Sequence, residues 1–161
     1  MRYAQFAILS FAILLCTPAH AATRIDDPVK FVSGVYAKLQ VANPKNDYRE
    51  PEDIYTPRLA ALFALAEKEA AGEVGRIDFD FWTNSQDFEL KDVKVRGQAV
   101  EGAKDREVVI ATFKNVGRPE EIHFYFEKDK SGWKLDDARS MSGGETWTLS
   151  LILKYGWDSG N

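Results

Sequence analysis

Apolar side chains recur with a helical period directly after an Asp-Asp-Pro sequence at 26–28. An aspartate suits the N-cap of a helix, and proline suits its first position. The apolar positions that follow are Val29, Val32, Val35, Tyr36 and Leu39. This spacing predicts a helix that begins at Pro28 and ends near Val41.

The same signal of a capping residue and a proline is repeated at Thr56 and Pro57. A second helix is predicted from Pro57, ended by Gly72, with its buried stripe at Leu59, Leu62, Phe63, Leu65 and Ala66. Residues 42–55, between the two helices, hold two prolines and many charges. They predict a long surface loop.

After residue 92 the apolar positions follow a period of two, which is typical of half-buried strands. Four such stretches, joined by short polar connections, lie at 93–99, 108–113, 122–127 and 133–136. Residues 145–155 fit a short helix better, although Thr146, Thr148 and Ile152 also allow a strand. Two helices followed by an antiparallel meander indicate an α+β domain over residues 22–161, with N-terminal helices packed in a curved antiparallel β-sheet.

The first 21 residues have the pattern of a secretory signal peptide, a basic Arg2 and an apolar run before Ala19-His20-Ala21. Cleavage is expected near Ala21, with a periplasmic or secreted mature protein. The apolar run is too short for a membrane span, and Leu15 before Cys16 is unlike a lipoprotein signal, so no membrane anchor is expected.

Cleavage would leave no cysteine, so disulfides are excluded, and would leave one histidine, His123. Removing Arg2 from the 21 basic residues leaves 20 against 25 acidic ones, a net charge of −5. This acidic balance argues against nucleic acid and anionic membranes as partners.

Residues 77–90, I-D-F-D-F-W-T-N-S-Q-D-F-E-L, mix acidic and amide side chains with large aromatics. The spacing of the acidic residues fits a calcium loop poorly, because Thr83 stands where such loops need glycine. We expect neither a metal nor a cofactor. The preferred interpretation is a connector whose aromatics fill the core and whose polar side chains, Asp87 among them, satisfy backbone groups.

Five segments of the chain carry a resemblance to a known family: P-V-K-F-V-S-G-V-Y at 28–36, I-Y-T-P-R-L-A-A-L-F at 54–63, I-D-F-D-F-W-T-N-S-Q-D at 77–87, F-x-N at 113–115 and G-W-K-L-D-D at 132–137. With these segments the chain resembles the secreted bacterial domains called domain of unknown function 3828, which are similar to the nuclear transport factor 2-like superfamily. The resemblance implies a cone-shaped α+β fold, a periplasmic address and, through the outer sheet face, a homodimer. It implies no specific activity, because this superfamily includes enzymes and pure binding modules.

Three classes of function remain open. The first is a non-catalytic module that binds a small molecule or peptide in the cone, with ligand-binding candidates Tyr36, Tyr55, Trp82, Gln86, Asp87, Tyr125 and Trp133. The second is a protein-binding module, an inhibitor or envelope-complex subunit, that docks a partner on the acidic loop at 47–53. The third is an isomerase or hydrolase with a buried carboxylate of raised pKa, for which the weak candidates are Asp80, Asp87, His123 and Asp137.

Overall fold

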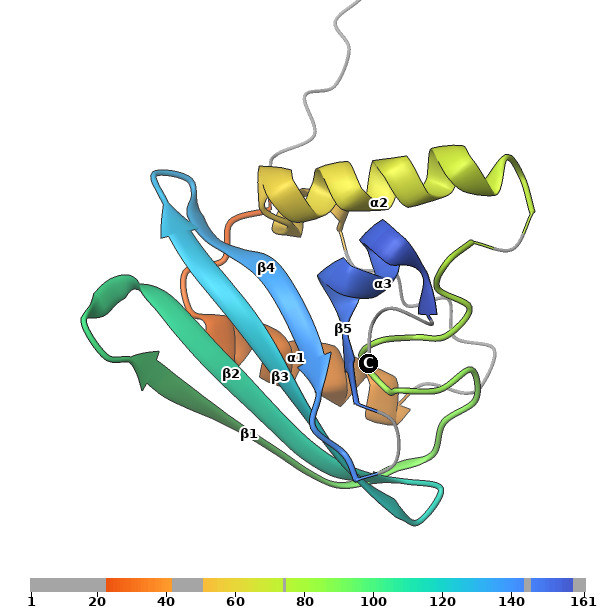
Figure 1. Cartoon of the computed structure of the whole chain (residues 1–161). Coiled ribbons are helices and arrows are strands. Elements are labelled where there is room, and N and C mark those ends of the chain that lie inside the picture. The colour runs from red at the N-terminus through yellow and green to blue at the C-terminus, as the bar shows by residue number, and fades with distance from the viewer. Residues whose placement is uncertain (1–22, 42–50, 74, 144–145, 158–161) are drawn as a thin grey trace, which may run out of the picture.

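The computed structural model describes residues 23–41, 51–73, 75–143 and 146–157. Over these residues the chain forms an α+β fold with three α-helices and one five-stranded antiparallel sheet (Figure 1). The predicted signal peptide and most of the predicted loop at 42–55 lie outside the described residues. No helix in the described part of the chain is long and apolar enough to cross a membrane.

The two predicted helices form where the capping signals place them. Helix α1 spans Pro28–Val41, and the Asp27 carboxylate accepts a hydrogen bond from the Lys30 N–H (3.0 Å). Helix α2 spans Pro57–Ala70. Just before α2, the predicted loop contains a short 3-10 helix, η1 (Glu52–Ile54), which corrects that part of the prediction.

The buried stripe predicted for α2 is wrong at one position. Leu59 and Ala66 are buried, but Leu65 is 40% exposed. The reason is that α2 does not lie on the sheet. It packs mainly on the C-terminal helix, beyond the β4 side of the sheet, so a narrower part of its surface is covered (Figure 1).

The sheet is a meander in which each strand pairs with the next in the chain. Its strands are β1 (Leu90–Val100), β2 (Ala103–Asn115), β3 (Arg118–Asp129), β4 (Gly132–Ser140) and β5 (Trp147–Thr148). The first four are longer than predicted, because most of the residues added at their ends are charged or polar and carry little hydrophobic signal. Tight turns at Gly102, Gly117 and Gly132, each with a positive φ, join them.

The C-terminal stretch combines both structures that its sequence allows. Trp147 and Thr148 pair with β4, and helix α3 (Leu149–Tyr155) follows immediately. The Asp137 carboxylate of β4 accepts hydrogen bonds from the Ser150 N–H (3.0 Å) and Ser150 Oγ (2.5 Å). A carboxylate at this position caps the first turn of α3 from another strand.

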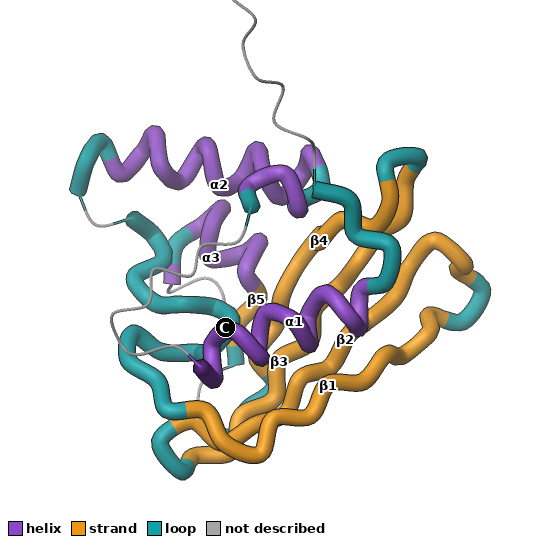
Figure 2. The backbone as a smooth tube through the Cα atoms, turned by 180° about the vertical axis from the view of Figure 1, so that it is seen from behind, coloured by secondary structure: helices purple, strands orange, loops and turns teal. Residues whose placement is uncertain are grey.

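Helix α1 crosses one face of the sheet and closes the main core (Figure 2). The alternate side chains of β3 that face it, Ile122, Phe124 and Phe126, are fully buried. Gly97 of β1 permits the close approach of α1, since a Cβ at this position would lie 2.9 Å from Val29 Cγ2 and 2.6 Å from Glu107 Oε1.

Gly97→Ala is expected to lower the free energy of unfolding by about 1–2 kcal/mol, because the added methyl group overpacks the contact between α1 and β1. Urea unfolding of the two proteins measures this difference. Gly34→Ala is the matched control: its Cβ would meet no atom within 4 Å. It is expected to be neutral or stabilising in the middle of a helix. An unchanged stability of Gly97→Ala would contradict the proposed close packing.

Candidate functional site

Residues 80–85 of the connector form a turn that is closed by its own backbone. The Asp80 N–H donates to the Ser85 carbonyl (3.0 Å), and the Thr83 N–H donates to the Asp80 carbonyl (3.2 Å). The Asp80 carboxylate accepts from the Trp82 N–H (2.7 Å), and Asn84 has a left-handed backbone (φ 56°). The turn places Trp82 in the core and directs Asn84 away from it.

A single buried amide from the sheet holds this turn. Asn115, at the end of β2, is fully buried, and its Nδ2 donates to the Thr83 carbonyl (3.1 Å) and to Ser85 Oγ (2.7 Å). Its Oδ1 accepts from the Glu89 N–H (3.0 Å). Asn115 therefore holds both the turn and the C-terminal end of the connector on the sheet.

A second amide, that of Asn84, links the connector to Trp147 and Glu120. Asn84 Oδ1 accepts from the Trp147 indole N–H (2.7 Å), which fixes which way the amide points. Its Nδ2 then donates to Glu120 Oε2 (3.0 Å). Glu120 is only 7% exposed, so a nearly buried carboxylate of β3 is oriented by a chain of two hydrogen bonds from a buried tryptophan.

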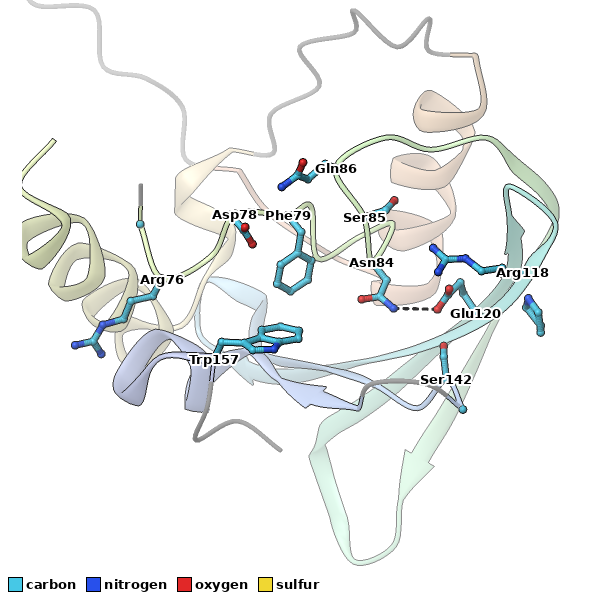
Figure 3. A pocket seen from close by; sticks show the side chains of 13 residues that line it. Arg76, Asp78, Phe79, Asn84, Ser85, Gln86, Arg118, Glu120, Ser142 and Trp157 are labelled. Atoms are coloured by element: carbon cyan, nitrogen blue, oxygen red, sulfur yellow. Dashed lines mark hydrogen bonds between the residues drawn. The ribbon is translucent and has the colours of Figure 1, made fainter. Parts of the chain in front are cut away.

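Beside Glu120 lies a cavity of about 1070 Å³, at the upper end of the volumes usual for ligand pockets. The connector from Gly75 to Gln86 forms one wall, the start of β3 forms another, and Ser142, Gly143 and Trp157 complete it. Figure 3 shows Phe79 and Trp157 on one side of the cavity, with Arg118 and Glu120 on the other. The rings of Phe79 and Trp157 meet edge to face, with centroids 5.5 Å apart.

The two arginines of the cavity differ in their partners. Arg76 donates to the Leu153 carbonyl (3.0 Å) and forms an ion pair with Glu69. Arg118 forms no ion pair with any described residue, although Glu120 lies two positions along the same strand. Arg118 is exposed, so its guanidinium can reach a ligand without giving up a protein partner.

The seven ligand-binding candidates do not converge on one pocket. Only Gln86 lines this cavity. Tyr36 and Trp82 are each 1% exposed, and Tyr36 Oη donates to the Trp82 carbonyl (2.7 Å), so both belong to the core. Burial raises the pKa of Tyr36 well above 10, and the charges of Asp80 and Glu120 raise it further.

Tyr55, Tyr125 and Trp133 lie in three other places. Tyr55 stacks on Phe63 of α2, with ring centroids 4.9 Å apart. Tyr125 lines a hollow on the outer face of the sheet, and Trp133 is buried beside Ile25 at the start of β4. These residues were predicted to bind a ligand because they combine polar and aromatic character. In the structure, β3 directs Tyr125 away from the core, and the N-terminal segment covers Trp133.

The carboxylates and the histidine proposed for catalysis are also separated. Asp80 closes the connector turn, and Asp137 caps α3. His123 lies on the outer face of the sheet, where its Nε2 is 2.6 Å from Glu121 Oε1. The expectation that Asp87 satisfies buried backbone groups is wrong: Asp87 is exposed, and none of the described backbone groups donates to it. Asn115 has that role instead.

The acidic residues of the connector do not gather around one point. Among the described residues, no group of three or more histidine, cysteine, aspartate or glutamate side chains is placed to hold a metal ion. Asn84, which a calcium loop would use as an oxygen ligand, has its Oδ1 on Trp147.

Four residues of the site were not predicted from the sequence: Arg118, Glu120 and Trp157, which line the cavity, and Asn115, which anchors the connector. The F-x-N motif at 113–115 was the one available signal for Asn115. Arg118 and Glu120 lie in R-P-E-E, which looks like a solvated turn. Only the pairing of β2 with β3 shows that Glu120 faces inward beside Phe113.

Two equally buried tryptophans allow a test of the hydrogen bond to Asn84. Trp82 and Trp147 are both 1% exposed, but Trp82 Nε1 has no partner among the described residues. Trp147→Phe is expected to cost about 2 kcal/mol more than Trp82→Phe, because it leaves Asn84 Oδ1 unpaired while Trp82→Phe removes an unpaired donor. Urea unfolding measures both variants, and equal losses would contradict the role of Trp147.

Comparisons of the chain with protein-family models, with characterised proteins and with solved structures find no match in any of the three. The fold and the site define this protein as an α+β domain with a polar and aromatic cavity beside its sheet.

Proposed function

We propose that this protein is a non-catalytic module that binds a small molecule or a short peptide in the cavity between the connector and β3. The observation that carries the proposal is the oriented, nearly buried Glu120 carboxylate in a cavity of about 1070 Å³ with an aromatic wall. Ligand pockets combine apolar surface with a few fixed polar groups of this kind. Ser85, Gln86 and Ser142 add hydroxyl and amide groups at the same cavity.

Binding is favoured over catalysis because the residues that the sequence suggested for acid–base chemistry are used elsewhere. Asp80 and Asp137 bond to the protein's own backbone, and His123 pairs with Glu121 on the opposite face of the sheet. The cavity holds Glu120 with Asn84 as its hydrogen-bond donor, and no described histidine, lysine or tyrosine lines it. An enzyme would need a second proton-transfer group beside Glu120. The other carboxylate of the cavity, Asp78, is exposed and lies on the Phe79 side, across from Glu120 (Figure 3).

The family and the location of the protein belong to the same proposal. The order of two helices, a meander and a third helix supports membership of the nuclear transport factor 2-like superfamily and, within it, of the secreted bacterial domain of unknown function 3828. The first 21 residues support export to the periplasm. In the periplasm, small metabolites, cell-wall fragments and peptides are the ligands to test.

A thermal-shift screen of the purified protein against such compounds tests the binding function. A ligand at 100 times its Kd is expected to stabilise the fold by about 2.7 kcal/mol. Gln86→Ala, which changes the cavity, is expected to reduce this shift, and Tyr125→Phe, on the outer face, is expected to leave it unchanged. A shift that survives Gln86→Ala and is lost in Tyr125→Phe would place the site on the outer face instead.

A further inference from the structure

Four charged side chains line the cavity: Arg76, Asp78, Arg118 and Glu120. Arg76 is paired with Glu69 and Asp78 is exposed on the connector, whereas the two charges on β3 are not paired with each other. Arg118 and Glu120 are two positions apart on β3, so both point to the same side of the sheet. No ion pair forms between them, and Asn84 is the described residue that donates to Glu120. Within the described part of the chain, neither Glu120 Oε1 nor the Arg118 guanidinium has a hydrogen-bond or ion-pair partner, so both can bind a ligand on the same wall.

The Glu120 carboxylate would be stabilised by a further hydrogen-bond donor. Glu120 as a residue is only 7% exposed, so its carboxylate is shielded from much of the solvent, and among the described residues its hydrogen-bond donor is the neutral amide of Asn84. A cationic N–H donor gives shorter and stronger bonds to a carboxylate than a neutral donor does. The chemistry of this position therefore selects an ammonium group over a hydroxyl or an amide.

Arg118 supplies the complementary preference. A guanidinium presents two parallel N–H donors that match a carboxylate. On the opposite side of the cavity, Phe79 and Trp157 present half-buried aromatic surface to an apolar group (Figure 3). The cavity thus offers three sites of different chemistry.

We infer that the ligand is a zwitterion with an apolar side chain, a free α-amino acid in which the ammonium binds Glu120, the carboxylate binds Arg118 and the side chain packs on Phe79 and Trp157. This inference rests on the proposed binding function and specifies its ligand class. The Trp147–Asn84 pair holds Glu120 in place before the ligand enters, which lowers the entropy cost of binding.

Isothermal titration of the full protein with four probes tests the inference. Phenylalanine carries both charges, 2-phenylethylamine only the cation, 3-phenylpropanoate only the anion, and N-acetylphenylalaninamide neither. Phenylalanine is expected to bind at least tenfold more tightly than each of the other three. Equal affinity for phenylalanine and either singly charged probe would overturn the inference.

Two substitutions separate the contributions of the charges. Glu120→Gln keeps an acceptor for Asn84 and is expected to weaken phenylalanine and 2-phenylethylamine at least tenfold, with 3-phenylpropanoate unchanged. Arg118→Gln, at an exposed position, is expected to weaken phenylalanine and 3-phenylpropanoate instead. Glu121→Gln and Arg139→Gln, on the outer face, are the matched controls and are expected to leave every affinity within twofold.

Different outcomes would disprove the amino-acid inference and the proposed binding function on which it rests. If none of the four probes binds but the screen finds a ligand whose thermal shift is lost in Gln86→Ala, the binding function stands and the amino-acid inference is wrong. If no compound binds the protein at this cavity, both are wrong. If phenylalanine binds and both charge substitutions leave its affinity unchanged, the inference is wrong.

Discussion

Asn115→Ala is expected to lower the free energy of unfolding by about 3–5 kcal/mol, the largest effect of any single substitution considered for this protein. The change removes three hydrogen bonds at a fully buried position. It leaves the Thr83 carbonyl, Ser85 Oγ and the Glu89 N–H without their partner from the sheet. Each unpaired buried group costs about 1–3 kcal/mol, and partial rearrangement of the connector offsets some of the sum.

Chemical denaturation measures this loss, with Gln98→Ala on the exposed face of β1 as the control expected to stay within about 0.5 kcal/mol of the parent. Asn115→Asp separates hydrogen bonding from volume. It keeps the acceptor for Glu89 but replaces the donor to Thr83 with an oxygen, so it is expected to be about as destabilising as alanine. A stable Asn115→Asp protein would show that the amide donor is not what holds the connector.

Asp136→Ala is expected to cost about 2–4 kcal/mol, because Asp136 joins the start of α2 to the sheet. Its carboxylate accepts from Thr56 Oγ1 (2.7 Å), Arg58 Nε (3.0 Å) and Arg58 Nη2 (2.8 Å). Thr56 is itself 6% exposed and caps α2 through the Leu59 N–H (3.2 Å). The alanine variant leaves the buried Thr56 hydroxyl without its acceptor and removes the ion pair to Arg58, which keeps the Asp136 carbonyl and Asp137 as partners.

This contribution of Asp136 is expected to depend on pH. Burial alone would raise the pKa of Asp136, but hydrogen bonds from Arg58 and Thr56 and the charge of Arg58 outweigh it and hold the pKa below 3.8. Because the pKa is lower in the folded state, the stabilisation is fully present above about pH 4 and is lost as the pH falls through the folded-state value. The difference in stability between the parent and Asp136→Asn is therefore expected to shrink below pH 4.

Denaturation curves at several pH values measure this dependence. Asp105→Asn, an exposed residue of β2, is the control and is expected to match the parent at every pH. A constant difference between the parent and Asp136→Asn from pH 3 to pH 7 would contradict the assignment of the lowered pKa to Asp136.

The sequence was sufficient for elements whose signals are local. The start of α1 at Pro28 follows from a cap and a proline, and the inward face of β3 follows from the alternation of Ile122, Phe124 and Phe126. The exposure of Leu65 was not predictable, since the helical pattern shows an apolar stripe but not how much of it a neighbour covers.

The site was harder to predict because its geometry depends on contacts between distant segments. Glu120 is nearly buried because the connector folds over the start of β3. Asn84 of the connector and Glu120 are 36 residues apart in sequence. The connector was correctly singled out as a polar and aromatic segment, but the residue that anchors it, Asn115, comes from the sheet. A large aromatic such as Trp133 looks the same in sequence whether it lines a pocket or fills the core.

The most direct test of the central claim, that the cavity beside Glu120 binds a ligand, is an NMR titration that follows the four tryptophan indole N–H signals. The titrant is the compound that gives the largest thermal shift. Trp157 lines the cavity and Trp147 bonds to Asn84 on its wall, so both signals are expected to move, while Trp133 at the far end of β4 stays in place. A titration in which Trp133 moves and Trp147 and Trp157 do not would contradict the claim.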